Sequence, residues 1–158
     1  AFVRRGAWEY VTRPQVSGIV LIIPITADGK IILIEQFRPP VDAPVIELVA
    51  GLAGDIAGQA DEDILAAARR ELLEETGFEA GHFEQVAEGP PSAGASDEYM
   101  TVFRATELRK VDAGGGDEHE DIIVHEVPLT DVEPWLAAQQ RRGCVIDLKV
   151  YAGLYFAN

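Results

Sequence analysis

Cysteine and basic residues are scarce in this sequence. Cys144 is the one cysteine among 158 residues, which excludes a disulfide framework and a zinc site built from four cysteines. We expect its thiol to act as a small buried apolar group.

Lys and Arg number 13 against 27 Asp and Glu, so the net charge is −14. Binding to nucleic-acid phosphates or to an anionic membrane needs clustered basic residues. The charge therefore argues against both partners, and a phosphate-bearing substrate would need a cation to offset the repulsion.

Long apolar runs are also absent. The longest, residues 19–25, contains Pro24 and has the length of a strand, whereas a transmembrane helix needs roughly 18 apolar residues. A basic segment followed by an apolar stretch, the pattern of a signal peptide, is missing too. We therefore expect a cytoplasmic protein. Apolar residues make up 47% of the chain, and at this length we expect one domain over residues 1–158 with a substantial core.

The spacing of apolar and turn residues predicts strands that alternate with helices. The predicted strands are residues 18–25, 31–35, 45–50, 83–87, 100–106 and 122–127. Asp61 is expected to cap a helix that ends at Thr76, with Gly77 as its left-handed stop. Two further helices are predicted over residues 130–143, opened by a capping box of Thr130 and Glu133, and over residues 147–156. The predicted fold class is α/β, with helices covering the sheet.

Glutamates cluster on one face of the helix predicted over residues 61–76. Glu71 stands at i,i+3 to Glu74 and at i,i+4 to Glu75, so the three share that face. Glu62, nine positions earlier, falls within a quarter turn of it. Like charges at these spacings destabilise a helix by about 0.2–0.5 kcal/mol per pair, so a bound cation would explain the cluster. Hard oxygen ligands suit Mg²⁺ or Mn²⁺. The alternative is a solvated acidic face, tempered by the two arginines before Glu71.

The segment over residues 62–78 resembles the Nudix box of the Nudix hydrolases, G-x5-E-x7-R-E-U-x-E-E-x-G-U, in which U is apolar. Here it reads E-x7-R-E-L-L-E-E-T-G-F, so every position from the first glutamate onward matches. The usual spacing would place the opening glycine at position 56, which is Ile56. Gly51 is similar to that glycine, and we interpret the surplus within residues 53–60 as a loop insertion, which costs little.

Further segments are similar to the ADP-ribose pyrophosphatase-like branch of this family. They are W-E-Y-V-T-R at 8–13, L-I-E-Q-F-R-P-P at 33–40, I-E-L-V-A-G-L at 46–52, S-A-G-A-S-D-E at 92–98, D-E-H-E-D at 117–121 and I-D-L-K-V-Y at 146–151. The resemblance implies an α/β/α sandwich around a mixed sheet. It also implies hydrolysis of ADP-ribose to AMP and ribose 5-phosphate, or of a related nucleoside diphosphate sugar.

The resemblance assigns a metal site to the box. Glu71, Glu75 and the backbone carbonyl of Ala50 would hold Mg²⁺ or Mn²⁺ ions, with Glu74 either as an additional ligand or as a residue that contacts the ligands. Arg70 would orient these glutamates. Such ions neutralise diphosphate oxygens and activate water at neutral pH.

The resemblance also implies substrate contacts. The implied substrate-binding residues are Trp8, Glu9, Arg13, Arg38, Glu47 and Ser96. Arg38 would grip a phosphate, because a guanidinium fork matches its geometry. Trp8 would stack on adenine; the alternative is a core or dimer-interface tryptophan. Since the branch typically forms homodimers, the short N-terminal segment, residues 1–16, would contribute to the substrate site and to the interface.

The acidic loop at residues 117–121 would supply the carboxylate that positions or deprotonates water. Glu118 and Glu120 are both candidates, and three glycines at 114–116 would form the hinge of the loop.

Two other functions stay open. One is a pyrophosphatase that removes unwanted nucleoside triphosphates, and the other is a non-catalytic sensor that binds ADP-ribose. The complete set of box glutamates and the lack of a visible second domain favour the hydrolase.

Overall fold

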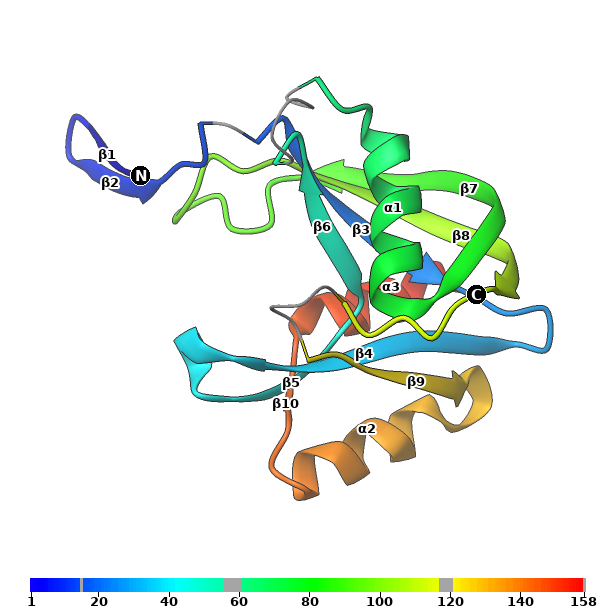
Figure 1. The fold of residues 1–158 in the computed structure, drawn as a ribbon. Coiled ribbons are helices and arrows are strands. Elements are labelled where there is room, and N and C mark those ends of the chain that lie inside the picture. Colours follow the sequence, from blue (N-terminus) through cyan, green and yellow to red (C-terminus); the bar gives the residue numbers. More distant parts are fainter. Residues whose placement is uncertain (15, 56–60, 117–120, 158) are drawn as a thin grey trace.

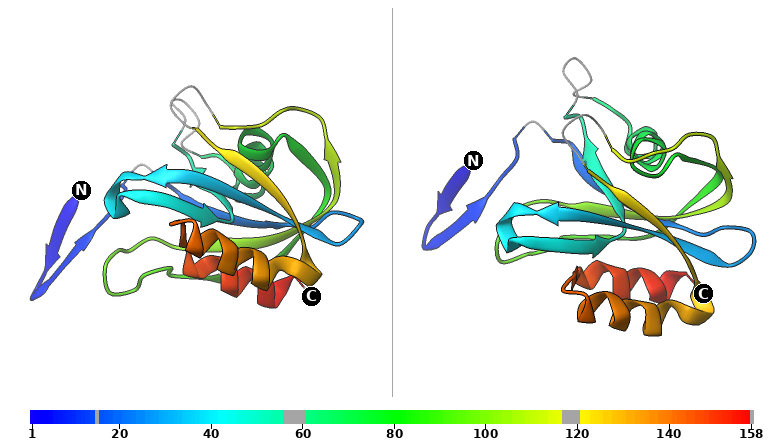
Figure 2. Two further views of the ribbon diagram at one scale, coloured as in Figure 1. Left: turned by 90° about the horizontal axis from the view of Figure 1, so that it is seen from below. Right: turned by 60° about the horizontal axis from the view of Figure 1, so that its bottom comes forward.

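The computed structural model describes residues 1–14, 16–55, 61–116 and 121–157. Within these ranges two four-stranded sheets lie between helices, and a two-stranded hairpin stands apart at the N-terminus (Figure 1). Helix α1 (Ile64–Thr76) covers one side, while α2 (Val132–Arg141) and α3 (Leu148–Phe156) cover the other (Figure 2). The predicted α/β class, with helices on both sides of mixed sheets, is confirmed.

The strands pair mainly with antiparallel neighbours. The first sheet has the order β10 (Val145–Ile146), β5 (Ala43–Glu47), β4 (Lys30–Arg38), β9 (Ile123–Pro128). The second has the order β6 (Val49–Ala53), β3 (Gly18–Pro24), β8 (Met100–Lys110), β7 (Phe78–Gly89). The hairpin consists of β1 (Phe2–Arg5) and β2 (Trp8–Val11). Parallel pairing joins β10 to β5 and β3 to β8. Short 3₁₀ turns occupy Pro39–Val41 and Leu129–Asp131.

Strand β3 explains why its sequence is a continuous apolar run. Val20 and Ile22 belong to the core beneath α1. Leu21 and Ile23 belong to the core shared with α2 and α3. Successive strand residues point to opposite faces, and both faces of β3 are covered, so no position favours a polar side chain. This buried strand fixes the neighbouring β6 and α1, which carry the candidate site.

One predicted strand divides in two. Residues 45–50 were expected to form a single strand, but β5 ends at Glu47 and β6 begins at Val49, each in a different sheet. Leu48 lies between them, 1% exposed, against Gly153 of α3. Burial of this side chain under α3 turns the chain from one sheet to the other.

Helix ends also differ in part from the prediction. The N-cap of α1 is Asp63, whose Oδ1 accepts hydrogen bonds from the backbone of Leu65 (3.0 Å) and Ala66 (3.1 Å), so the cap predicted at Asp61 is wrong. Gly77 does end α1 in the left-handed conformation, with φ of 70°. The capping box predicted before α2 is also wrong, because a 3₁₀ turn precedes α2 and its N-cap makes no side-chain bond.

Two further expectations concern the interior and the membrane. Cys144 is buried, as predicted, at 5% exposure. In the part of the chain that the structure describes, no helix combines the length and the apolar character needed to cross a membrane.

Candidate active site

Helix α1 packs against β6 and brings one glutamate onto the strand backbone. The side chain of Glu71 lies so close to Gly51 that a Cβ atom at position 51 would overlap its carboxylate. Gly51 does not need glycine for its backbone angles, since its φ lies outside the left-handed range. The requirement is space, and it gives a physical reason for a glycine at this position of the strand.

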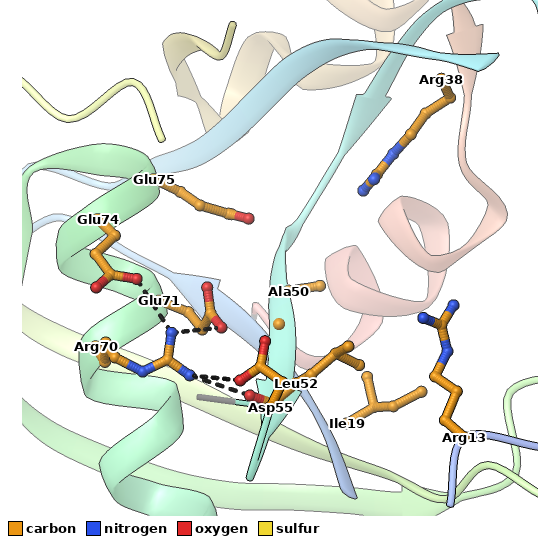
Figure 3. A pocket seen from close by; sticks show the side chains of 11 residues that line it. Arg13, Ile19, Arg38, Ala50, Leu52, Asp55, Arg70, Glu71, Glu74 and Glu75 are labelled. Atoms are coloured by element: carbon orange, nitrogen blue, oxygen red, sulfur yellow. Dashed lines mark hydrogen bonds and ion pairs between the residues drawn. The ribbon is translucent and has the colours of Figure 1, made fainter. Parts of the chain in front are cut away.

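Arg70 ties the glutamates of the box together. Its Nε and Nη2 donate to the two carboxylate oxygens of Glu62 (3.1 and 3.2 Å), and Nη1 donates to Glu71 (2.9 Å) and Glu74 (3.1 Å). Nη2 also donates to the carbonyl of Leu52 on β6 (3.0 Å). The guanidinium thus lies between the acidic side chains, as Figure 3 shows for Glu71 and Glu74. The resemblance implies an orienting role for Arg70, and these contacts are compatible with it.

Glu62 reaches this network from outside the helix. It precedes the N-cap of α1, so the placement of Glu62 on the helical face of Glu71 is wrong. The extended segment before α1 carries Glu62 to Arg70 and to the backbone N–H of Gly54 (3.3 Å). The hydrogen bond from Arg70 lowers the pKa of Glu62 and, reciprocally, raises the pKa of Arg70, so both groups stay charged.

The three box glutamates on α1 have different surroundings. Burial raises the pKa of the Glu71 carboxyl to about 7, and the neighbouring Arg70 only partly opposes this effect. Glu75 is 4% exposed, whereas Glu74 lies at the surface. A buried carboxylate binds a cation in a site of low dielectric constant, where charge interactions are stronger than in water.

These side chains line a cavity of about 360 Å³. Its lining consists of Arg13, Ile19, Arg38, Ala50, Gly51, Leu52, Asp55, Arg70, Glu71, Glu74 and Glu75. Glutamates from α1 stand on one side, and the guanidinium groups of Arg13 and Arg38 stand across from them (Figure 3). One cavity therefore contains the predicted metal ligands together with three arginines, Arg13, Arg38 and Arg70.

The donors of this cavity fit a hard divalent cation. Glu71 and Glu75 are one helical turn apart, and Ala50 adds the strand backbone beside them. Carboxylate and carbonyl oxygens are the ligands that Mg²⁺ and Mn²⁺ prefer. Over the described ranges, no three His, Cys, Asp or Glu side chains already form a metal-ligand group. Arg70 instead lies between Glu71 and Glu74 and neutralises part of their charge.

Arg38 is held from behind by a buried glutamate. Its Nε donates to Oε2 of Glu47 at 2.6 Å, and Glu47 is 8% exposed. The two residues lie on the paired strands β4 and β5. Glu47, predicted as a substrate-binding residue, is therefore a partner of Arg38 and not part of the cavity lining.

Three predicted substrate residues lie away from this cavity. Trp8 and Ser96 line a separate hollow of about 330 Å³ between the N-terminal hairpin and the 92–97 loop. Glu9 lies on β2, opposite Arg4 of β1 in the register of the hairpin. Trp8 is 65% exposed, so within one chain it is not a core residue. The hairpin extends away from the body of the molecule (Figure 1).

The acidic loop begins beside the box glutamates. Glu118 and Glu120 lie outside the described residues. The glycines before them are anchored on the end of α1, because Gly115 donates to the carbonyl of Glu75 (2.9 Å) and Gly116 to the carbonyl of Glu74 (3.1 Å). All three hinge glycines have positive φ, which favours glycine.

The structure adds residues that the sequence reasoning missed. Asp55 lines the cavity and lies 3.5 Å from Arg70. It belongs to the surplus residues after Gly51, where no motif indicates a role. Glu98 bonds to Arg13 at 2.6 Å. These two residues are 85 positions apart, so no spacing pattern connects them.

Comparison with known proteins identifies related sequences. A family profile described as the NUDIX domain matches residues 17–148. A methanol dehydrogenase activator of Bacillus methanolicus is 35% identical over 124 residues, which cover 78% of this chain and 63% of that protein. An ADP-ribose pyrophosphatase of Bacillus subtilis (strain 168) is 36% identical over 124 residues, with the same coverage. A GDP-mannose pyrophosphatase of Enterobacter sp. (strain 638) is 32% identical over 121 residues, 72% of this chain and 60% of that protein.

The chain thus spans 60–63% of the length of these relatives. Among solved structures, the crystal structure of an ADP compounds hydrolase is similar with a TM-score of 0.64 and 26% identity. The match covers 80% of this chain and 66% of that chain.

Proposed function

Because this chain belongs to the NUDIX domain family, we propose that residues 1–158 act as one hydrolase domain that cleaves the diphosphate of ADP-ribose or of a related nucleoside diphosphate sugar. One observation carries the proposal. A single cavity has glutamates of α1 on one wall and the guanidinium groups of Arg13 and Arg38 on the other. A diphosphate needs positive charge on both sides, which a cation on the glutamates and the two arginines would provide together. Relatives named ADP-ribose pyrophosphatase and GDP-mannose pyrophosphatase support the substrate class.

NUDIX hydrolases generally depend on a divalent metal ion. In this chain Glu71, Glu75 and the carbonyl of Ala50 would hold Mg²⁺ or Mn²⁺, with Glu74 as an additional ligand. When bound, such a cation supplies the positive charge that offsets the diphosphate oxygens and polarises phosphorus. Arg70 keeps the glutamates oriented through its bonds to Glu71 and Glu74.

The remaining residues bind the substrate and move the proton. Arg38, fixed by Glu47 at its Nε, offers its terminal nitrogens to a phosphate in the geometry that a guanidinium fork favours. A water oxygen then bonds to one phosphorus, and the bond between that phosphorus and the bridging oxygen breaks, so that the bridging oxygen leaves with the other phosphate. The proton of the water passes to a carboxylate oxygen of Glu118 or Glu120. With ADP-ribose the products are AMP and ribose 5-phosphate.

We also infer that two copies of the chain associate through the N-terminal hairpin. A lone two-stranded hairpin is marginally stable, and this one exposes Phe2 (83%) and Trp8 (65%). Packing against a second copy would cover these side chains and bring Trp8, Glu9 and Ser96 to a substrate site. Light scattering on the purified protein tests this inference. A mass of twice 17.1 kDa supports it, and a monomer at high concentration contradicts it.

Product formation by the purified protein tests the hydrolase. ADP-ribose, ADP-glucose, GDP-mannose and a deoxynucleoside triphosphate are each incubated with Mg²⁺ and with Mn²⁺, and Glu75→Gln is the matched control. We expect AMP from ADP-ribose with the wild type, and a rate reduced by about 100-fold or more in the variant. Hydrolysis of another sugar nucleotide in place of ADP-ribose would change the substrate assignment but leave the proposed mechanism unchanged. Turnover of the triphosphate alone supports the alternative pyrophosphatase. No turnover, with ADP-ribose still raising the melting temperature, supports a sensor.

A further inference from the structure

The guanidinium group of Arg13 is held by a carboxylate from a distant loop. Its Nε donates to Oε1 of Glu98 at 2.6 Å, and the hydroxyl of Ser96 donates to the other carboxylate oxygen at 3.2 Å. The Glu98 side chain is 19% exposed, whereas the Arg13 side chain is 55% exposed. The carboxylate is therefore the fixed partner, and the arginine is the group that reaches into solvent.

Backbone hydrogen bonds join the two segments that carry this pair. The N–H of Val11 donates to the carbonyl of Ala95 (2.9 Å), and the N–H of Asp97 donates to the carbonyl of Val11 (3.4 Å). Beyond Arg13, the N–H of Ile19 donates to the carbonyl of Tyr99 (3.0 Å). The chain on both sides of Arg13 is thus attached to the loop that presents Glu98. The position of the guanidinium depends on this loop as well as on its own segment.

Arg13 stands at the boundary between two cavities. It lines the cavity of the box glutamates and also a neighbouring cavity of about 280 Å³, which Glu98 and Tyr99 line as well. The bond to Glu98 uses Nε, so the terminal nitrogens are the donors that remain for a ligand. Figure 3 shows the guanidinium across the cavity from Glu71 and Glu75.

Arg38 has the same arrangement in the same cavity. Its Nε is bonded to Glu47 at 2.6 Å, as that of Arg13 is bonded to Glu98 at 2.6 Å. Two arginines, each fixed at Nε by a glutamate that does not line the cavity, thus face the acidic wall. A side chain that is already ordered loses less freedom when it binds a ligand.

We propose that Glu98 is a positioning residue, which holds Arg13 so that its terminal nitrogens bind the substrate phosphate farther from the box glutamates. The inference rests on the proposed function, because it concerns how that site binds a diphosphate. Glu98 itself does not touch the reacting atoms. Ser96 assists by bonding to the second oxygen of Glu98.

Steady-state kinetics with ADP-ribose tests the role of Glu98. Glu98→Gln keeps the shape of the side chain and removes its charge, so we expect KM to rise roughly tenfold while kcat stays within about twofold. Arg13→Ala should raise KM at least as much. The double variant should be no worse than Arg13→Ala, because Glu98 acts only through Arg13. Glu98→Asp, which keeps the carboxylate, should recover part of the loss.

A matched control separates this role from general destabilisation. Glu79→Gln breaks the ion pair between Glu79 and Arg109, which is also 2.6 Å long but joins β7 to β8 away from the cavity. It should leave KM unchanged. An unchanged KM in Glu98→Gln, or effects of Glu98→Gln and Arg13→Ala that simply add, would overturn the proposal. Where Glu98→Gln does not fold, judged by circular dichroism, Glu98→Asp takes its place, with a smaller rise in KM expected.

The failure of the proposed function is distinguishable from the failure of this inference. A wild-type protein that hydrolyses none of the substrates contradicts the proposed function. In that case the dissociation constant of ADP, measured by calorimetry, replaces KM. Roughly tenfold weaker binding of ADP by Glu98→Gln than by the wild type then supports the positioning role, and equal binding overturns it.

Discussion

The space beside Gly51 decides where the carboxylate of Glu71 lies. A methyl group at this position would overlap that carboxylate, and the strand backbone cannot yield easily because β6 is paired with β3. We therefore expect Gly51→Ala to push Glu71 out of the cavity and to weaken Mn²⁺ or Mg²⁺ binding by roughly tenfold or more. Calorimetric titration with the metal measures this change.

Gly153→Ala is the control for that prediction. Its added methyl group would crowd Leu48 in the core beneath α3, and α3 lies on the opposite side of the sheets from α1 (Figure 2). This variant should lower the melting temperature and leave metal affinity unchanged. Equal metal affinity in Gly51→Ala and in the wild type would show that Glu71 is not held by the contact with the strand.

A second residue-scale prediction concerns Glu35, which is 7% exposed on β4. Burial alone would raise its pKa, but hydrogen bonds from His125 (2.9 Å) and Arg142 (2.5 and 2.6 Å) outweigh burial and lower the pKa below its usual 4.5. A carboxyl with a lower pKa in the folded state stabilises the protein fully above the unfolded pKa. That contribution is lost as the pH falls through the folded value.

We therefore expect Glu35→Gln to lower the free energy of unfolding at pH 7 by about 1–3 kcal/mol. The difference from the wild type should shrink as the pH falls below about 4.5. Urea denaturation at a series of pH values measures both effects. Glu126→Gln, at an exposed site on the strand of His125, should change little. A difference between Glu35→Gln and the wild type that stays constant down to pH 3 would contradict the expected contribution.

At the scale of elements, the start of α1 can be tested, because the sequence predicts an N-cap at Asp61 and the structure has it at Asp63. The first backbone N–H groups of a helix need acceptors, and removing an N-cap carboxylate costs about 1 kcal/mol. Asp63 accepts from Leu65 and Ala66, so Asp63→Ala should lower the free energy of unfolding by about that amount. Asp61→Ala should change it by less than about 0.5 kcal/mol. Chemical denaturation measures the free energy of unfolding of both variants. A larger loss in Asp61→Ala than in Asp63→Ala would support the cap predicted at Asp61.

Elements whose signals are local were the ones that could be predicted. Gly77 ends α1 in the left-handed conformation. Glycine adopts this conformation readily, so the residue type alone predicts the end of the helix. The break at Leu48 is different, since it depends on α3, which covers that side chain from about 100 positions later in the chain. The two-residue strand β10 likewise exists only through its pairing with β5.

The candidate site divides in the same way. Arg70 and three box glutamates lie within one helix, where spacing alone places Glu71, Glu74 and Glu75 on one face and Arg70 at i,i+4 to Glu74. Helical spacing does not apply to Glu62, because the helix starts after it. The pairs Arg38–Glu47 and Arg13–Glu98 join separate segments of the chain, so only the folded chain shows which carboxylate each arginine contacts. The resemblance named both arginines and Glu47, but it did not indicate that Glu47 and Glu98 hold the two arginines.

At the scale of the whole molecule, the net charge of −14 leads us to expect that a divalent cation, when bound, stabilises the fold. Glu71, Glu74, Glu75 and Asp55 line one cavity, and Arg70 neutralises only part of their charge. A ligand that binds the folded state at 100 times its dissociation constant adds about 2.7 kcal/mol to the free energy of unfolding. For a chain of this size that corresponds to a rise in melting temperature of about 5–10 °C. We expect this rise when Mg²⁺ or Mn²⁺ is added to protein treated with a chelator.

Two comparisons make the thermal measurement specific. Glu75→Gln removes one of the proposed metal ligands, which is buried, so its melting temperature should respond to the metal much less than that of the wild type. Sodium chloride at equal ionic strength screens the overall charge without occupying the cavity, so it should stabilise both proteins by similar, smaller amounts. If the salt alone reproduces the full effect in both, the cation acts on the net charge and the carboxylates of α1 are a solvated acidic face. If only the divalent ion stabilises, and only in the wild type, the carboxylates of this cavity are its binding site.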